Sequence, residues 1–359
     1  MKITLRRESR GIALMVVMIA IFVLAVLAGA FAYSMKVETK LAMNANNDAT
    51  MVWLGRSGVE LARWTLANRH SCPGEPPCDA LNQKWAGGPG SMMASNCPVA
   101  DVSLDNFPVG AGTVSIKIRD LERKININVA DEPVLQQGLT LVGVDASEIA
   151  SISACILDWI DRDNITRVNG AESDYYQSLI PPYYAKNGPI DDLSELLLVR
   201  GVTPGMYWGS SSTNHAPAAF QKMDHWGRPV EEPAYAVGLV ELFTPLSGPK
   251  LKLNTASPTV LQMIPGVDVN AAAQIVKMRA GPDGVDGTED DTPFNNVGEA
   301  AMAVNPQLMQ QLSRYCDVVS QTFEVQVDAS LGGYHRTFYG VVAQNGNTHE
   351  MQVLSFYWK

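Results

Sequence analysis

The longest apolar run of the chain lies close to its N-terminus. Twenty-two residues from Ile12 to Tyr33 carry no charged or strongly polar side chain, and Lys2, Arg6, Arg7 and Arg10 precede them. A helix of this length crosses the hydrocarbon core of a bilayer, and basic residues stay on its cytoplasmic side. The pattern predicts a transmembrane helix over residues 12–34. The run exceeds the 7–15 apolar residues of a cleaved secretory signal, which favours a retained anchor.

A helical pattern continues beyond the apolar run. Residues 35–65 contain no proline, and apolar side chains such as Leu41, Met51 and Leu54 recur among polar ones. We therefore expect a single rod of about fifty residues, roughly 75 Å long.

The next segment, residues 66–124, contains both irregular and regular parts. Residues 69–108 are rich in Gly, Pro, Ser and Asn, which predicts a long surface excursion rather than a packed element. Residues 112–119 then alternate apolar and polar positions, as a half-buried strand does.

The last part of the chain, residues 236–359, ends in a β pattern. Two short helices are expected at 297–304 and 306–315, followed by strands at 317–328, 334–343 and 351–359 with glycine-containing turns between them. With residues 113–119, these strands would form an antiparallel sheet packed on the outer half of the long helix. The expected fold class is α+β: a pilin-like helix on a sheet, with an inserted α-helical domain at 125–235.

Two stretches of the chain echo each other. Residues 128–135 and 254–261 share Asn, Ala, Val and Leu at the same offsets, and Gly-Val-Asp follows each, at 143–145 and 266–268. Each copy predicts a capped helix, a glycine turn and a second helix. This order of helix, glycine turn and helix is similar to helix-hairpin-helix modules, which bind DNA phosphates through backbone N–H groups. Asp145 and Asp268 stand where such modules have a second glycine, and a carboxylate there would repel phosphate.

Composition and charge reduce the number of function classes that fit the chain. The 359 residues are 46% apolar and 18% charged with a formal charge of −10, so the chain folds and has no bulk attraction for nucleic acid. No HExxH, GxSxG, P-loop or GxGxxG motif occurs. We expect a protein that is not an enzyme; a membrane-anchored periplasmic DNA-uptake protein is the alternative.

Acidic residues gather in two places. The loop 281–291 holds five carboxylates and three glycines without a base, which favours a hard cation such as calcium; a solvated acidic turn is the alternative. The second group is the weaker candidate for a metal, since Asp161 and Asp163 could instead cap the loop into Glu172. The loop candidates are Asp283, Asp286, Glu289, Asp290 and Asp291, and the second group is Asp158, Asp161, Asp163 and Glu172, with Asp174 nearby.

The chain has five cysteines. Cys72 and Cys78 flank a short Pro- and Gly-containing loop and are the predicted disulfide, with Cys97 able to compete for either partner. Cys155 and Cys316 are expected to be small core residues.

The N-terminal junction carries a family resemblance. Arg10-Gly11 followed by Ile12-Ala13-Leu14-Met15-Val16 resembles a type IV prepilin site. This implies cleavage after Gly11 by a prepilin peptidase and methylation of Ile12. Loss of residues 1–11, which hold four basic and one acidic residue, changes the formal charge from −10 to −13. Most pilins have glutamate at the position of Val16, and its absence resembles the minor pseudopilin K family.

The interior of the chain extends this resemblance. Residues 158–163, 169–176, 184–189 and 194–196 look like the inserted α-domain of the minor pseudopilin K family of type II secretion systems (general secretion pathway protein K). The resemblance implies a subunit at the tip of a periplasmic pseudopilus, in complex with minor pseudopilins I and J and above the major pseudopilin. It also implies a single-pass anchor in the bacterial inner membrane, help in exporting folded exoproteins, bound calcium and no nucleic acid partner.

Overall fold

The structure is a computed structural model that describes residues 10–71, 76–90, 98–99, 102–209, 235–346, 348 and 350–358, with side chains from Ala13 onward. Residues 1–9 of the predicted leader, Cys72, Cys97 and residues 210–234 of the predicted insertion lie outside the described residues.

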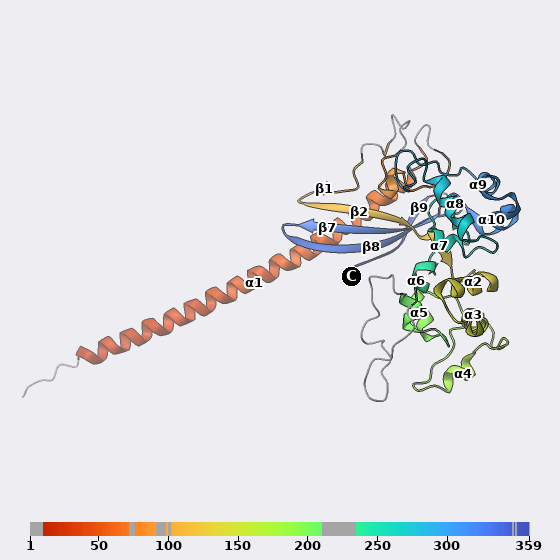
Figure 1. Cartoon of the computed structure of the whole chain (residues 1–359). Helices are drawn as coiled ribbons and strands as arrows, with labels where there is room; N and C mark the ends of the chain where they lie inside the picture. Colours follow the sequence, from red (N-terminus) through yellow and green to blue (C-terminus); the bar gives the residue numbers. More distant parts are fainter. Residues whose placement is uncertain are drawn as a thin grey trace, which may run out of the picture.

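One long helix, α1 (Arg10–Ala67), dominates the shape of the molecule (Figure 1). Its 58 residues correspond to about 87 Å at 1.5 Å per residue. Residues 13–46 are exposed, and regular burial begins at Met51, where the helix reaches the sheet. The expected continuous rod is confirmed and runs two residues beyond its predicted end.

The sheet is five-stranded and antiparallel, in the order β1-β2-β7-β8-β9. Gly332 and Gly333 make the turn between β7 and β8 with positive φ angles of 53° and 89°. The predicted meander is confirmed, although β7 begins at residue 322 rather than 317, because residues 316–317 pair elsewhere as β6. The strands are β1 (Phe107–Val109), β2 (Gly112–Asp120), β7 (Thr322–Leu331), β8 (Tyr334–Gln344) and β9 (Met351–Trp358).

The outer half of α1 packs on one face of this sheet. Met51, Leu54 and Leu66 of the helix share a core with alternate residues of the strands, among them Ile116 and Val325. Alternation along β2 and β7 places every second side chain in this core, as the period of a strand requires.

Part of the predicted surface excursion is in fact packed. Trp85, in the 3₁₀ turn η1 (Lys84–Ala86), is 2% exposed and meets the ring of Phe323 edge-on at 5.1 Å. Asp79 is fully buried and accepts a hydrogen bond from Arg69 Nε at 2.7 Å. The prediction was wrong for residues 78–86, because their partners are distant in the sequence and leave no local periodicity.

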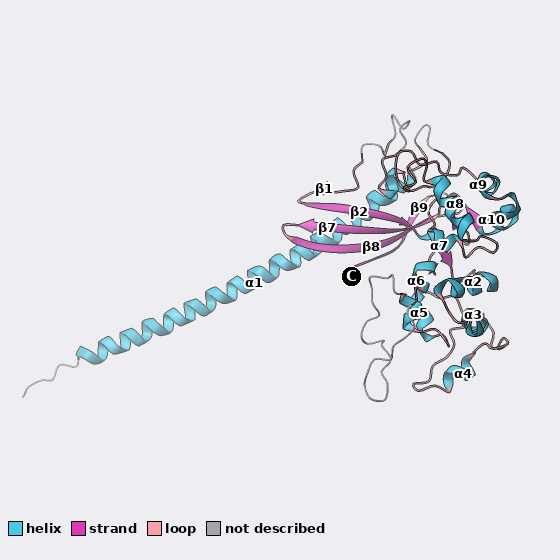
Figure 2. Ribbon diagram, in the orientation of Figure 1, coloured by secondary structure: helices cyan, strands magenta, loops and turns pink. Residues whose placement is uncertain are grey.

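Helices form the remainder of the molecule and gather at the end of the sheet that is remote from the apolar end of α1 (Figure 2). One buried core joins them, and it includes residues from Ile127 through Tyr235 to Val318, so it continues past the predicted boundary at residue 235. The helices are α2 (Glu132–Val142), α3 (Ala146–Ile160), α4 (Ser173–Gln177), α5 (Pro204–Trp208), α6 (Leu239–Leu242), α7 (Pro258–Leu261), α8 (Val269–Arg279), α9 (Val297–Val304) and α10 (Met309–Tyr315), with 3₁₀ turns η2 (Leu121–Arg123), η3 (Leu193–Leu198) and η5 (Pro306–Leu308).

Two short parallel strand pairs complete this helical part. Strand β3 (Ile125–Asn126) pairs with β4 (Phe243–Thr244), and β5 (Leu251–Lys252) pairs with β6 (Cys316–Asp317). They tie the beginning of the helical part to its end. The helical part is therefore closed by contacts between residues about 65 to 120 positions apart.

Each echoed segment forms a helix, a glycine turn and a second helix. Asp131 and Ser257 cap α2 and α7, each followed by a proline in the first turn. Asp145 and Asp268 cap the second helices, α3 and α8, by accepting hydrogen bonds from Ser147 N and Ala271 N. The predicted caps are observed; the likeness to DNA-binding modules finds no confirmation.

Candidate assembly helix and cation sites

The inner half of α1 is an apolar surface that no other described part of the chain covers. Its large side chains are half to two-thirds exposed or more, for example Phe22 at 70% and Phe31 at 68%. Among the described residues, α1 is the one helix long and apolar enough to cross a membrane. Its length and its lack of burial agree with a single-pass anchor.

The predicted processing residues lie at the beginning of this helix. The backbone of Gly11 and Ile12 is part of the first turn of α1, and their side chains are outside the described ones. Val16 lies one turn further and is 60% exposed. Cleavage after Gly11 and methylation of Ile12 stay predictions.

The structure brings together three of the four carboxylates of the second acidic group. Asp158 is on the last turn of α3, Asp161 is its C-cap, and Glu172 is the residue before α4. One carboxylate oxygen from each of the three lies within 4.8 Å of the others. Asp163 is not in the cluster; its carboxylate accepts a hydrogen bond from Ile165 N.

Arg167 is part of this cluster and was missed by sequence reasoning. Its Nη1 donates to Asp158 Oδ1 at 2.8 Å and to Asp161 Oδ2, and its backbone N–H also points at the Asp158 carboxylate. Among the described residues, neither oxygen of Glu172 has a hydrogen-bond partner. Burial, together with the charges of Asp158 and Asp161, raises the pKa of Glu172 to about 7.

The acidic loop 281–291 curls as its glycines predict. Gly281, Gly284 and Gly287 have positive φ angles of 65°, 71° and 92°. Its five carboxylates, however, do not converge: Asp283, Asp290 and Asp291 accept hydrogen bonds from N–H groups of the loop itself, and Glu289 is exposed.

Asp286 of this loop faces a base that lies just outside the loop. Arg279, the last residue of α8, is 3% exposed and donates to both oxygens of Asp286, at 2.9 and 2.7 Å. The same guanidinium donates to the carbonyl oxygens of Leu253 and Ala256. The loop itself contains no base, but Arg279 in the last turn of the preceding helix is a sequence signal that could have pointed to this partner.

The cysteines divide between the core and the undescribed residues. Cys155 and Cys316 are fully buried in the core of the helical part, as expected. Cys78 is also buried there. Since Cys72 lies outside the described residues, the Cys72–Cys78 disulfide stays a prediction.

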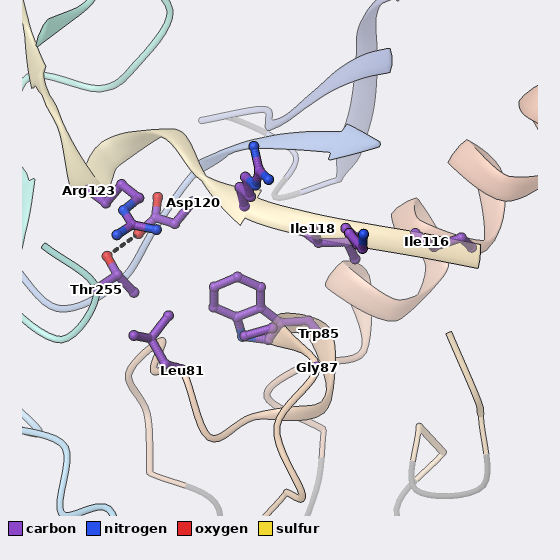
Figure 3. Close-up of a pocket in the computed structure, with 11 residues that line it drawn as sticks. Leu81, Trp85, Gly87, Ile116, Ile118, Asp120, Arg123 and Thr255 are labelled. Atoms are coloured by element: carbon purple, nitrogen blue, oxygen red, sulfur yellow. Dashed lines mark hydrogen bonds between the residues drawn. The ribbon is translucent and has the colours of Figure 1, made fainter. Parts of the chain in front are cut away.

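A cavity of about 280 Å³ lies between β2 and residues 81–87. Figure 3 shows Asp120, Arg123 and Thr255 at one end of it and Ile116 at the other. Asp120 accepts hydrogen bonds from Thr255 Oγ1 and Ser320 Oγ, both at 2.6 Å. Burial raises the pKa of Asp120 to about 6. Its oxygens hold together the sheet and the helical part, a structural use that the sequence did not reveal.

Comparisons with known proteins agree with the resemblance drawn from the sequence. Residues 116–208 match the family model described as type II secretion system protein K. Three proteins named type II secretion system protein K are similar to this chain. The one from Pectobacterium carotovorum is 30% identical over 28% of this chain and 35% of its own length, and the one from Aeromonas hydrophila is 25% identical over 56% and 61%. The one from Pseudomonas aeruginosa is 23% identical over 86% of this chain and 85% of its own length. The alignments thus span about a third to three-fifths of the first two relatives.

A solved structure has the same fold. A chain in the crystal structure of the GspK-GspI-GspJ complex of the enterotoxigenic Escherichia coli Type 2 Secretion System matches with a TM-score of 0.58 and 17% identity, over 89% of this chain and 99% of that one. The resemblance to the protein K family of type II secretion systems is confirmed, and so is the expected α+β fold of a long helix, an antiparallel sheet and an inserted helical region.

Proposed function

We propose that this chain is a minor pseudopilin that begins the pseudopilus of a type II secretion system and remains at its tip. The observation that carries the proposal is the division of α1: residues 13–43 are exposed along their whole length, while the part from Met51 is fixed to the sheet. The sheet and the helical part together form the folded head of the molecule. An apolar helix held rigidly to this head can join a bundle of similar helices without any change in the head.

The position of the helical part supports a place at the tip. It lies at the end of the molecule opposite the apolar end of α1 (Figure 1). A subunit stacked further along the same axis would have to occupy that space. Val16 supports the same place. A glutamate in the hydrocarbon core is costly unless it meets a partner such as the N-terminus of a neighbouring subunit, and a subunit at the tip has one neighbour fewer.

The partners follow from this role. We infer assembly with minor pseudopilins of the I and J types, since the structural relative comes from a complex of those three proteins, and contact with the major pseudopilin below. Outside the apolar segment, exposed aromatic and aliphatic side chains lie on β9, an edge strand, and on the adjoining part of α1: Leu354 is 64%, Trp358 56% and Trp53 66% exposed. This surface is a suitable place for one of those partners.

The proposed location is the bacterial inner membrane, with the C-terminal bulk in the periplasm. Prepilin peptidase would cut after Gly11 and leave Ile12 as a methylated N-terminus, and the assembled tip would help folded exoproteins leave through the outer membrane. N-terminal sequencing of the membrane-extracted protein tests this. Methylated Ile12 is the expected result; an intact Met1, or a cut near Ala30, would overturn the proposal.

Calcium at the loop 281–291 is proposed with this function. What supports it is the composition of the loop, with five carboxylates in eleven residues, and the three glycine bends that let its backbone curl. Binding would require Asp283, Asp290 and Asp291 to exchange their backbone N–H partners for the cation. Calorimetric titration before and after Asp290→Ala with Asp291→Ala tests the site, and unchanged heats would reject it.

The role is one of assembly rather than catalysis, and DNA uptake has no support. At the start of each helix that follows a glycine turn, a backbone N–H group is already bonded to a carboxylate: Ser147 N donates to Asp145 and Ala271 N to Asp268. Helix N-termini bind anions through free N–H groups. An internal carboxylate at that place takes up one of these donors and opposes the approach of a second anion.

A further inference from the structure

We propose that the cavity between β2 and residues 81–87 binds the C-terminal end of another polypeptide. The last residues of that polypeptide would pair with the free edge of β2 at Ile118, and its terminal carboxylate would bind Arg123. The cavity lies where the sheet meets the helical part (Figure 3). This binding site is independent of the pseudopilin role.

One edge of β2 is only partly covered. Strand β1 pairs with residues 112–114 of β2, and Ile116 N donates to the carbonyl oxygen of Leu104 at 2.7 Å. Backbone groups two residues apart along a strand point to the same side, so the N–H and C=O groups of Ile118 also point away from β7, toward the cavity that Ile118 lines. Among the described residues, none bonds to these two groups from the cavity side. An unpaired edge of this kind is a template for a further strand.

Arg123, in η2, lines the same cavity and is half-buried. In the part of the chain that the structure describes, no group accepts a hydrogen bond from its guanidinium or forms an ion pair with it. Burial lowers the pKa of Arg123, and the positive charges of Arg279 and Arg119 act in the same direction. The negative charge of Asp120 opposes them, but its oxygens already accept hydrogen bonds from two hydroxyl groups and a backbone N–H group. A carboxylate from outside would supply the partner that Arg123 lacks.

The size and shape of the cavity favour the end of a chain over a strand that passes through. Its volume of about 280 Å³ equals the share of roughly nine water molecules in the liquid, which suits a short piece of extended chain. The hydrogen bond from Thr255 to Asp120 closes the end at which Arg123 lies (Figure 3). Leu81 and Trp85 form an apolar wall opposite β2. Arginine binds a carboxylate through two parallel N–H···O bonds, so a terminal carboxylate fits this closed end.

Retention of peptides by the detergent-solubilised, immobilised full chain tests the site. The probes are two pools of random pentapeptides, one with free C-terminal carboxylates and one with amidated C-termini, and retained peptides are quantified by mass spectrometry. We expect retention of the free pool to exceed that of the amidated pool by about tenfold or more, and Arg123→Gln to remove this excess. Arg314→Gln changes an arginine of α10 whose side chain is 65% exposed; it is the matched control and should retain peptides as the wild type does.

Two results with the wild type would overturn the proposal. One is equal retention of the two pools, or no retention of either. The other is selective retention of acidic peptides from the amidated pool, which would indicate that the cavity binds a side-chain carboxylate within a chain instead of a chain end.

The melting temperature of Arg123→Gln separates binding from a structural role. Since Arg123 has no partner in the described chain, its replacement should leave a cooperative transition at the wild-type temperature or above it. A lower melting temperature would show that Arg123 stabilises the fold, and the loss of peptide retention would then not support the site. N-terminal sequencing would still report on the pseudopilin role in that case.

Discussion

Gly58 lies where α1 packs tightly against the sheet. A Cβ built at this position would lie 2.4 Å from Val327 Cγ1, and one at Gly55, a turn earlier on the same helix face, would lie 2.5 Å from the Phe338 ring. The sequence shows both glycines but not their purpose, since helical periodicity reports which face is apolar and not how near the opposite surface lies. Two small residues allow the helix and the strands to touch.

Gly58→Ala is expected to lower the free energy of unfolding by about 1–3 kcal/mol, because the added methyl overpacks the contact with Val327. Urea unfolding of the full chain in detergent measures the change. Gly29→Ala is the matched control: no atom lies within 4 Å of its added Cβ. An equal effect of the two substitutions would contradict the close contact seen at Gly58.

Asp120 makes stability depend on pH in an unusual direction. Its pKa is about 6 in the folded chain and 3.8 in the unfolded one, so the folded state holds the proton more tightly. The resulting stabilisation is complete below pH 4 and is lost as the pH rises through 6. The difference corresponds to about 3 kcal/mol. Glu122, which pairs with Lys252 at 3.1 Å, adds to the repulsion of the charged form.

The difference in free energy of unfolding between the wild type and Asp120→Asn should therefore change with pH. Relative to the variant, the wild type is expected to lose up to about 3 kcal/mol between pH 4 and pH 7. Urea midpoints at several pH values measure this difference. Asp145→Asn, at an exposed helix cap, serves for comparison, and a parallel pH profile for wild type and Asp120→Asn would count against the raised pKa.

At the scale of elements, regular structure with local signals could be predicted well. Alternation located β2, β8 and β9, and the pairing of a capping residue with proline located the starts of α2 and α7. Residues 78–86 were missed, since Trp85 and Asp79 owe their burial to Phe323 and Arg69. Gly- and Pro-rich composition describes the backbone of such a segment but not its distant partners.

The rotation of the apolar half of α1 about the helix axis, relative to the half that packs on the sheet, gives a prediction for the element as a whole. Removing Ala42 from the exposed part rotates the apolar half relative to the head by about 100° and shortens the helix by about 1.5 Å, whereas removing residues 42–45 rotates it by about 40° and shortens it by about 6 Å. If the helix must present fixed faces to its neighbours, deletion of Ala42 reduces exoprotein secretion more than deletion of residues 42–45. Secretion by cells relying on each variant is the measurement; the opposite order would show that length matters more than phase.

At the scale of the whole molecule, the order of parts along the chain could be predicted, but not how they join. The anchor, the sheet and the inserted helices all follow from local patterns. The common core of the helical part, from Ile127 to Val318, does not, because it depends on the parallel pairs β3–β4 and β5–β6. The carboxylate cluster is similar: its acids could be picked out, but Arg167 and the exclusion of Asp163 depend on the path of the loop.

Net charge and the capped glycine turns predict no affinity for DNA. The full chain carries a formal charge of −10, and Asp145 and Asp268 each accept a hydrogen bond from a backbone N–H group at the start of the helix that follows the turn. No binding to duplex DNA is expected at micromolar protein and 50 mM salt, measured by fluorescence anisotropy with a labelled duplex. Binding that weakens with rising salt would instead indicate phosphate contacts.

The continuity of α1 has a mechanical consequence. Between Ala30 and Leu54 the sequence has neither glycine nor proline, and sharp bends in helices arise mainly at such residues. The helix therefore has no preferred place for a sharp bend between these residues. A push or a rotation applied at its apolar end is transmitted to the sheet and to the helical part at the far end, which turn together with the apolar segment.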